Sequence, residues 1–112
     1  MKARIKIDGK LVEIEDIKKV SGIGNITGLM FRKNSPALLF EIKNRAIHSF
    51  FCPRFIAVWI FEGKVVEYKI VEPWKLSILP EKDFDKLIEI PINSKYQHLL
   101  EFFVDKTKLS LS

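Results

Sequence analysis

The stretch FIAVWIFEGKVVEYKI, residues 55–70, decides the fold of this chain. Residues 55–61 are apolar at every position, a pattern typical of a central β-strand that is covered on both faces. Glu62-Gly63 interrupts the apolar run, and apolar and charged side chains then alternate towards residue 70. The pattern predicts two antiparallel strands, residues 55–61 and residues 64–70, joined by a two-residue turn.

A two-residue turn also fixes which residues lie opposite each other in the two strands. Trp59 then faces Val66, and Ala57 faces Tyr68. This register keeps aromatic and β-branched side chains on one face of the sheet. We therefore expect Tyr68 to lie beside Ala57.

The N-terminal residues show a second hairpin pattern. Asp8-Gly9 separates two alternating runs, residues 2–7 and residues 10–15, and Asp-Gly between such runs is a strong turn signal. The resulting register places apolar pairs on one face and opposite charges on the other. These pairs are Ile5–Val12, Ala3–Ile14, Arg4–Glu13 and Lys2–Glu15. A shift of one residue would lose both matches.

Further strands are predicted over residues 37–43, 46–52 and 87–92. Pro73 is expected to end the strand of residues 64–70. Because proline lacks a backbone N–H, we expect Pro91 to place the end of its strand at a sheet edge.

Helical signals are fewer. Residues 16–20 are expected to form one helical turn, and Asn93 or Ser94 to cap a short helix. Its apolar residues, Tyr96, Leu99, Leu100 and Phe103, follow helical spacing. Residues 108–111 alternate again and are interpreted as a strand that closes the sheet.

A chain of 112 residues, 47% hydrophobic and 29% charged, has the size and composition of one globular domain, residues 1–112. Six to seven short strands with frequent turn signals predict a mainly β fold. The expected architecture is a compact β-sandwich or partly open β-barrel with one or two short helices.

The net charge of +5 is unevenly distributed. Residues 21–60 hold five bases against the single acid Glu41, whereas residues 61–112 are nearly neutral. Three of these five bases are arginines, and arginine suits the recognition of planar anions. A basic face that only aids solubility is the alternative interpretation.

The N-terminus has no continuous apolar run, and the longest apolar stretch, residues 55–61, is far shorter than the roughly 20 residues that span a bilayer. The single cysteine, Cys52, excludes a disulfide within the chain. We expect a cytoplasmic protein with no membrane partner.

The run Gly28-Leu29-Met30-Phe31-Arg32 resembles the signature of the uncharacterised family named domain of unknown function 192. Other segments similar to that family follow in order over roughly residues 12 to 105. They are Leu38-Leu39-Phe40, His48-Ser49-Phe50-Phe51, residues 56–61, residues 63–66, Glu72-Pro73-Trp74 and residues 87–91. The resemblance implies a small, compact, mostly β domain with no established activity, and it supplies no catalytic residue.

One departure from the family pattern falls in the central strand. The family usually carries Asp where this chain has Ala57. If that acid has a role elsewhere in the family, this chain lacks it. Tyr68, expected opposite Ala57, would fill the space.

The chemistry-bearing residues form no recognisable catalytic set. Cys52 and His48 share a predicted strand, which separates them by about 13 Å, whereas a nucleophile and its base need roughly 3 Å. One cysteine and two histidines provide no close-spaced metal ligands. We therefore expect no catalytic residue, no metal and no cofactor.

The signature run has two interpretations. In the structural one, Gly28 allows a tight bend while Leu29, Met30 and Phe31 fill the core, and Pro73 belongs to the same structural signature. In the functional one, the basic residues Arg32, His48 and Arg54 line a cleft that holds an anion.

The leading hypothesis is a small non-enzymatic domain that binds a ligand or partner through this basic segment. Its partner would be an anionic small molecule, a protein or a nucleic acid. Two alternatives remain open. One is a single-stranded nucleic-acid binding protein, because basic and aromatic residues interleave in the middle of the chain. The other is an enzyme of unrecognised class.

Overall fold

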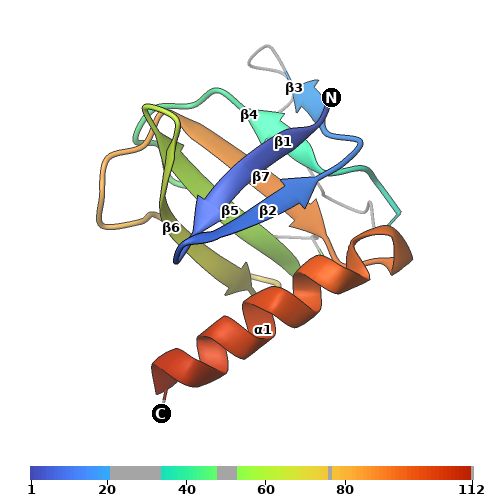
Figure 1. The fold of residues 1–112 in the computed structure, drawn as a ribbon. Coiled ribbons are helices and arrows are strands. Elements are labelled where there is room, and N and C mark those ends of the chain that lie inside the picture. The colour runs from blue at the N-terminus through green and yellow to red at the C-terminus, as the bar shows by residue number, and fades with distance from the viewer. Residues whose placement is uncertain (21–33, 48–52, 76, 112) are drawn as a thin grey trace.

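The computed structural model describes residues 1–20, 34–47, 53–75 and 77–111. Within them, seven short strands form two sheets, and a helix follows at the C-terminus (Figure 1). The elements are β1 (Ala3–Ile7), β2 (Lys10–Ile14), β3 (Lys18–Val20), β4 (Leu38–Phe40), β5 (Phe55–Phe61), β6 (Lys64–Val71), β7 (Lys86–Pro91), the 3-10 helix η2 (Ser94–Tyr96) and α1 (Gln97–Leu111). The mainly β fold class is confirmed.

The two sheets differ in size. β1 and β2 form an antiparallel hairpin, and the larger sheet has the order β3-β4-β7-β5-β6. β3 runs parallel to β4, whereas the other neighbouring strands are antiparallel. The hairpin lies over one face of the large sheet, and α1 runs along one side of both (Figure 1).

An inner cluster of apolar side chains fills the space between the hairpin, the large sheet and α1. Alternate residues of β5 and β7 enter it and meet apolar residues from the hairpin and the helix. Its most buried members include Ile14, Ile56, Val58, Ile88, Ile90, Tyr96, Leu99 and Phe103. Burial of these side chains by the hydrophobic effect holds the two sheets together.

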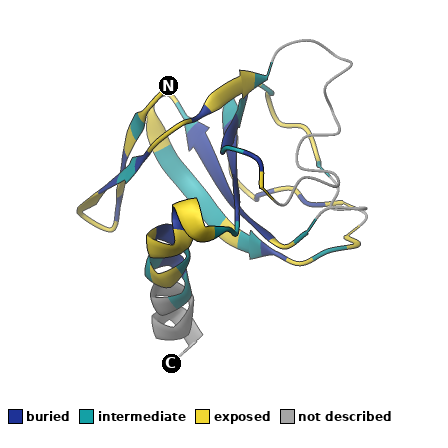
Figure 2. Cartoon of the chain, turned by 90° about the vertical axis from the view of Figure 1, so that its right-hand side faces the viewer, coloured by how far each residue is buried: buried dark blue, intermediate teal, exposed yellow. Residues whose placement is uncertain are grey.

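An outer cluster covers the opposite face of the large sheet. Three residues of β5, namely Phe55, Ala57 and Trp59, lie there with no exposed surface. Ile78 and Phe84, from the connection between β6 and β7, belong to the same cluster. Each face of β5 packs into its own cluster, which accounts for its apolar residues at every position. Figure 2 shows the buried strands in the middle of the sheet.

The register of β5 and β6 agrees with the prediction only near the turn. Phe61 pairs with Lys64, but a β-bulge between Trp59 and Ile60 shifts the remaining pairs by one residue. Trp59 therefore faces Glu67 instead of Val66. The predicted register was wrong because an extra residue on one strand changes every later pair.

The bulge also moves Tyr68 to the other face of the sheet. Tyr68 faces Val58, and its ring lies 5.2 Å from that of Phe103 in α1, centroid to centroid. Ala57 belongs to the outer cluster, whereas Tyr68 packs against the inner one. The prediction that Tyr68 fills the space beside Ala57 was wrong for this reason.

The N-terminal hairpin is confirmed with its predicted register, including Arg4 opposite Glu13. One charge pair differs from the expectation. Lys2 Nζ lies 3.2 Å from Glu13 Oε1, so Lys2 pairs with Glu13 instead of Glu15. The ladder ends at Ala3 and Ile14, so the strands no longer hold Lys2 and Glu15 opposite each other.

The helical turn expected at residues 16–20 does not form, and Lys18–Val20 is instead strand β3. Asp16 has a φ of 54°, which ends any right-handed helical turn, and Lys18 N donates to Ala37 O at 2.8 Å beside β4. Pairing with a neighbouring strand overrides the local helical preference here. The strand predicted over residues 37–43 is shortened to β4.

The remaining strand predictions concern residues 46–52 and the position of Pro91. Ile47 forms an isolated bridge with Ile78, and residues 48–52 lie outside the described residues. β7 itself is an inner strand, because it lies between β4 and β5, but Pro91 pairs only with Phe55 of β5, so this end of the strand is at a local edge as expected. The missing N–H of Pro91 is tolerated because β4 pairs with β7 only as far as Glu89.

The C-terminal helix begins as predicted and runs further than expected. The Asn93 side chain accepts a hydrogen bond from Lys95 N at 3.0 Å, a capping contact. Residues 108–111 belong to α1, so their interpretation as a strand was wrong. Adding residues to an existing helix is easier than nucleating a new element, and this outweighs the short alternation.

Candidate binding site at the Arg54 edge

The structure describes one of the three predicted anion-binding residues, Arg54. It directly precedes β5, and Pro73 follows the end of β6. The other predicted site and signature residues lie outside the described residues. They are Gly28, Leu29, Met30, Phe31, Arg32 and His48.

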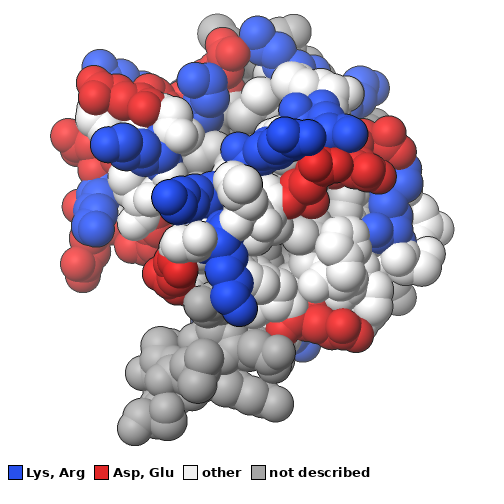
Figure 3. Space-filling model, in the orientation of Figure 1, with Lys and Arg blue, Asp and Glu red and all other residues white. Residues whose placement is uncertain are grey.

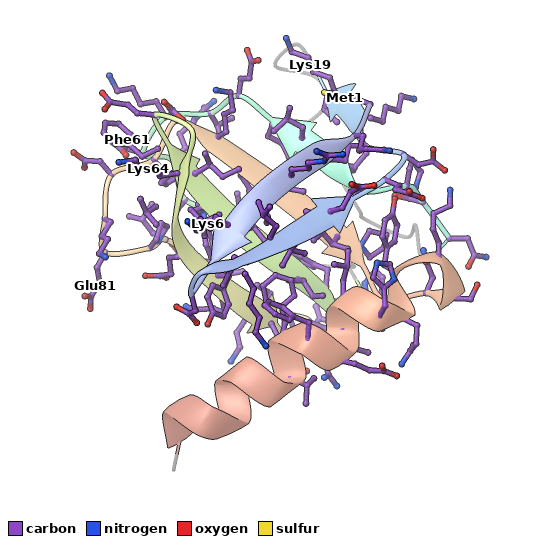
Figure 4. All side chains as sticks on the ribbon, viewed as in Figure 1. Met1, Lys6, Lys19, Phe61, Lys64 and Glu81 are labelled. Atoms are coloured by element: carbon purple, nitrogen blue, oxygen red, sulfur yellow. The ribbon has the colours of Figure 1, made fainter. Side chains whose placement is uncertain are left out.

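Arg54 and Pro73 lie at the same end of the β5–β6 hairpin, away from its turn. Phe55 pairs with Val71 at this end, whereas Phe61 and Lys64 mark the turn at the other (Figure 4). The residues that flank the Phe55–Val71 pair therefore lie side by side. We call this region the Arg54 edge; it consists of Arg54, Glu72, Pro73, Trp74 and Lys75.

A surface ion pair holds Arg54. Its Nε lies 3.5 Å from Glu72 Oε1, and the two side chains are 47% and 58% exposed. A guanidinium has five N–H donors, more than one carboxylate oxygen can use. Because exposed ion pairs contribute little to stability, an incoming anion can compete with Glu72 for Arg54.

Trp74 lies in a strained turn two residues after Glu72. Trp74 has a φ of 65° and is 61% exposed. Proline followed by a residue with positive φ is the arrangement of a type II turn, whose second central place normally goes to glycine or asparagine. The next residue, Lys75, is also exposed and adds a positive charge to the edge.

Sequence reasoning did not single out Trp74, which the structure places on the surface. The segment Glu72-Pro73-Trp74 entered only as part of the family resemblance and as the end of a strand. Pro73 was the available signal, because it favours the first central place of a turn and so puts the next residue on the surface.

The β1–β2 hairpin also carries a row of positively charged residues. Arg4 and Lys6 lie on the exposed side of β1, and Lys2 directly precedes the strand. Figure 3 shows lysine and arginine over this face with acids between them. Glu13 contacts both Lys2 and Arg4 at 3.2 Å. The hydrogen bond from Lys2 and the charges of Lys2 and Arg4 lower the pKa of Glu13. Glu13 therefore stays ionised and offsets part of the positive charge of this row.

Buried polar atoms lie below the outer face of the sheet. Trp59 Nε1 and Asp85 Oδ1 are buried without a hydrogen-bond partner, although Asp85 Oδ2 accepts from Glu62 N at 3.1 Å. Glu89 is only 6% exposed and faces Ala57 across β5 and β7. A carboxylate therefore lies on the strand next to the position where the family resemblance expects Asp.

The described residues bring together no set of groups for metal chemistry, since no three His, Cys, Asp or Glu side chains among them could share an ion. Tyr68 Oη donates to Asp8 Oδ2 at 3.4 Å. Burial and the nearby Asp8 carboxylate raise the pKa of Tyr68, so the phenol stays protonated at neutral pH. Tyr68 is thus a poor nucleophile, and the Arg54 edge remains the surface with the clearest binding chemistry.

No helix within the described ranges has both the length and the apolar character needed to cross a membrane. No family model matches the chain, and neither a curated protein nor a solved structure does. The resemblance seen at residues 28–32 therefore stays a prediction.

Proposed function

We propose that this protein is a small, cytoplasmic, non-enzymatic binding domain that takes an anionic ligand or partner at the Arg54 edge. One observation carries the proposal: Arg54 is half-exposed and is held by a carboxylate that is itself on the surface. Arginine in such a place can exchange one carboxylate for another planar anion without loss of a buried contact.

Binding would proceed by replacement of Glu72. The incoming carboxylate or phosphate would accept hydrogen bonds from the guanidinium, and bidentate contacts of this kind are stronger than a single hydrogen bond. Lys75 would add attraction at longer range. Glu72 would then turn to solvent. Because Glu72 competes for Arg54, only ligands that bind Arg54 more firmly than Glu72 does would replace it.

Two residues outside the described ranges stay in the proposal. Arg32 and His48 would supply further donors to the same anion, as their place in the basic segment suggests. Membership of the family that residues 28–32 resemble also stays part of the proposal, and it would imply no catalytic residue.

The proposal is tested with Arg54→Ala and a matched control, Arg4→Ala. Both variants remove an arginine from an exposed ion pair with a glutamate, so they change the net charge equally. We expect Arg54→Ala to weaken the binding of inorganic pyrophosphate, measured by titration calorimetry, by about 10- to 100-fold, because charged hydrogen bonds each contribute about 1.5–3 kcal/mol.

Arg4→Ala is expected to bind pyrophosphate nearly as well as the wild type. Equal weakening by both variants would show that only net charge matters, and the Arg54 edge would not be a site. Binding that is unchanged in Arg54→Ala would contradict the proposal directly.

A further inference from the structure

Trp74 occupies a position that suits it poorly in two independent ways. A left-handed backbone is unfavourable for a bulky side chain, and exposure of an indole to water forgoes the stabilisation that burial gives. Glycine or asparagine would fit the turn better, and a polar side chain would fit the surface better.

The other left-handed positions in the described residues show what is usual. Apart from glycines, they carry charged or amide side chains, and Trp74 is the aromatic exception. They are Asp8, Asp16, Asn44 and Glu62. Asp and Asn tolerate this backbone, and Asp8 and Glu62 each precede a glycine in a tight turn. Because strain of this kind gathers at functional sites, we take it as a sign of a binding role for the exposed Trp74 side chain.

The neighbours of Trp74 narrow the chemistry of its ligand. Trp74 comes two residues after Glu72, which pairs with Arg54, and directly before Lys75, so an exposed aromatic side chain and positively charged residues belong to one short stretch of surface. A ligand that uses both features has a planar ring attached to an anion. Nucleotides combine these two groups, and aromatic rings beside cations are the means by which proteins hold single strands.

We propose that Trp74 is a stacking platform for a base of a single-stranded nucleic acid, with Arg54 and Lys75 contacting the adjacent phosphates. This inference rests on the proposed function and names the ligand class of the same site. A protein partner is the competing occupant and becomes an outcome of the test.

The test compares Trp74→Gly with Glu62→Gly. Both place glycine at a left-handed position, so both should raise Tm by about 2–6 °C as strain is relieved. Only Trp74→Gly removes the ring. We expect it to weaken binding of a fluorescein-labelled oligothymidine, measured by anisotropy at low salt, by about 5- to 150-fold, the range that corresponds to one stacked base.

Glu62→Gly should bind at least as tightly as the wild type, since it removes an acid. Trp74→Phe should bind within about threefold, because it keeps an aromatic face. Together with a higher Tm for Trp74→Gly, these results would support the proposal.

Two results would overturn it. A lower Tm for Trp74→Gly would show that the ring supports the fold, and unchanged oligothymidine affinity would show that it stacks on no base. Loss of pyrophosphate binding in Arg54→Ala would still uphold the anion site in that case. If the wild type binds pyrophosphate but not oligothymidine, the nucleic-acid assignment fails while the proposed function stands, and a protein partner becomes the occupant to seek.

Discussion

The two tryptophans of this chain lie in opposite environments. Trp59 is in β5 with no exposed surface, and its ring meets Phe84 edge-on at 6.4 Å between centroids. Trp74 lies in a strained turn and is 61% exposed. One ring fills the outer cluster, and the other is presented to solvent at the Arg54 edge.

This contrast shows that residue type alone does not assign a role to an aromatic side chain. Trp59 is buried because β5 has strands on both sides and an apolar cluster on each face. Trp74 comes three residues after Val71, the last residue of β6, where the ladder with β5 has ended. Position in the sheet, and not hydrophobicity, separates the structural ring from the candidate binding ring.

Truncation of each tryptophan ring is expected to have the largest effect on the free energy of unfolding, and it tests this contrast directly. Trp59→Ala should lower the free energy of unfolding by about 3–5 kcal/mol, the usual consequence of emptying a core position of this size. Trp74→Ala should change it by less than about 0.5 kcal/mol, since a surface residue leaves no cavity. Urea unfolding followed by circular dichroism measures both values. Similar losses in the two variants would mean that the turn is part of the core.

A second contrast concerns the polar groups of buried aromatic rings. Trp59 Nε1 has no hydrogen-bond partner, whereas Tyr96 Oη accepts from Ala37 N at 2.8 Å and donates to Glu15 O at 2.9 Å. Tyr96 thereby ties the start of α1 to two segments far away in sequence. Its hydroxyl satisfies a buried backbone N–H that has no access to water.

Tyr96→Phe should therefore lower the free energy of unfolding by about 1–3 kcal/mol, because it leaves the Ala37 N–H unsatisfied while the ring volume is kept. Tyr68→Phe is the matched control. The Tyr68 hydroxyl makes one exposed contact of 3.4 Å with Asp8, so we expect a loss below about 0.5 kcal/mol. Equal effects in the two variants would contradict the role assigned to Tyr96.

The elements that the sequence predicted correctly depend on local patterns. The N-terminal hairpin has a strong turn signal, and its alternating residues admit one register only. The strand β5 was recognised as central from its apolar residues on both faces. In these segments the local preference and the tertiary packing agree, so short-range reasoning was sufficient.

The errors arose where tertiary contacts decided the structure. The bulge between Trp59 and Ile60 leaves no signal in composition, yet it reverses the face of Tyr68. β3 forms because β4 is available as a partner, which residues 16–20 alone do not reveal. The Arg54 edge shows the same difference between what local patterns reveal and what the tertiary structure decides. Arg54 was predicted from residue type and charge, whereas Trp74 required knowledge of backbone conformation and exposure.

The smallest effect on stability is expected from an ion pair whose two side chains are both at the surface. Lys95 Nζ lies 2.6 Å from Asp16 Oδ2, and this hydrogen bond and charge lower the pKa of Asp16 below its ordinary value of 3.8. A lowered pKa in the folded state means that the ion pair stabilises the fold above the unfolded pKa. The contribution is lost as pH falls through the folded value. The acidic side of the stability profile should therefore include a small decrease below about pH 4 that comes from Asp16.

Asp16→Asn should remove this part of the decrease, so that Tm falls less steeply between about pH 4 and pH 2 than in the wild type. Glu81→Gln is the control, since it neutralises an exposed acid in the connection between β6 and β7 (Figure 4). Differential scanning calorimetry across this range gives both profiles. Identical slopes for Asp16→Asn and the wild type would show that the contact does not persist in solution. The start of α1 would then be held by the hydrogen bonds of Asn93 and Tyr96 and by buried apolar side chains, so its stability would depend on contacts away from solvent, as the contrast between the two tryptophans indicates.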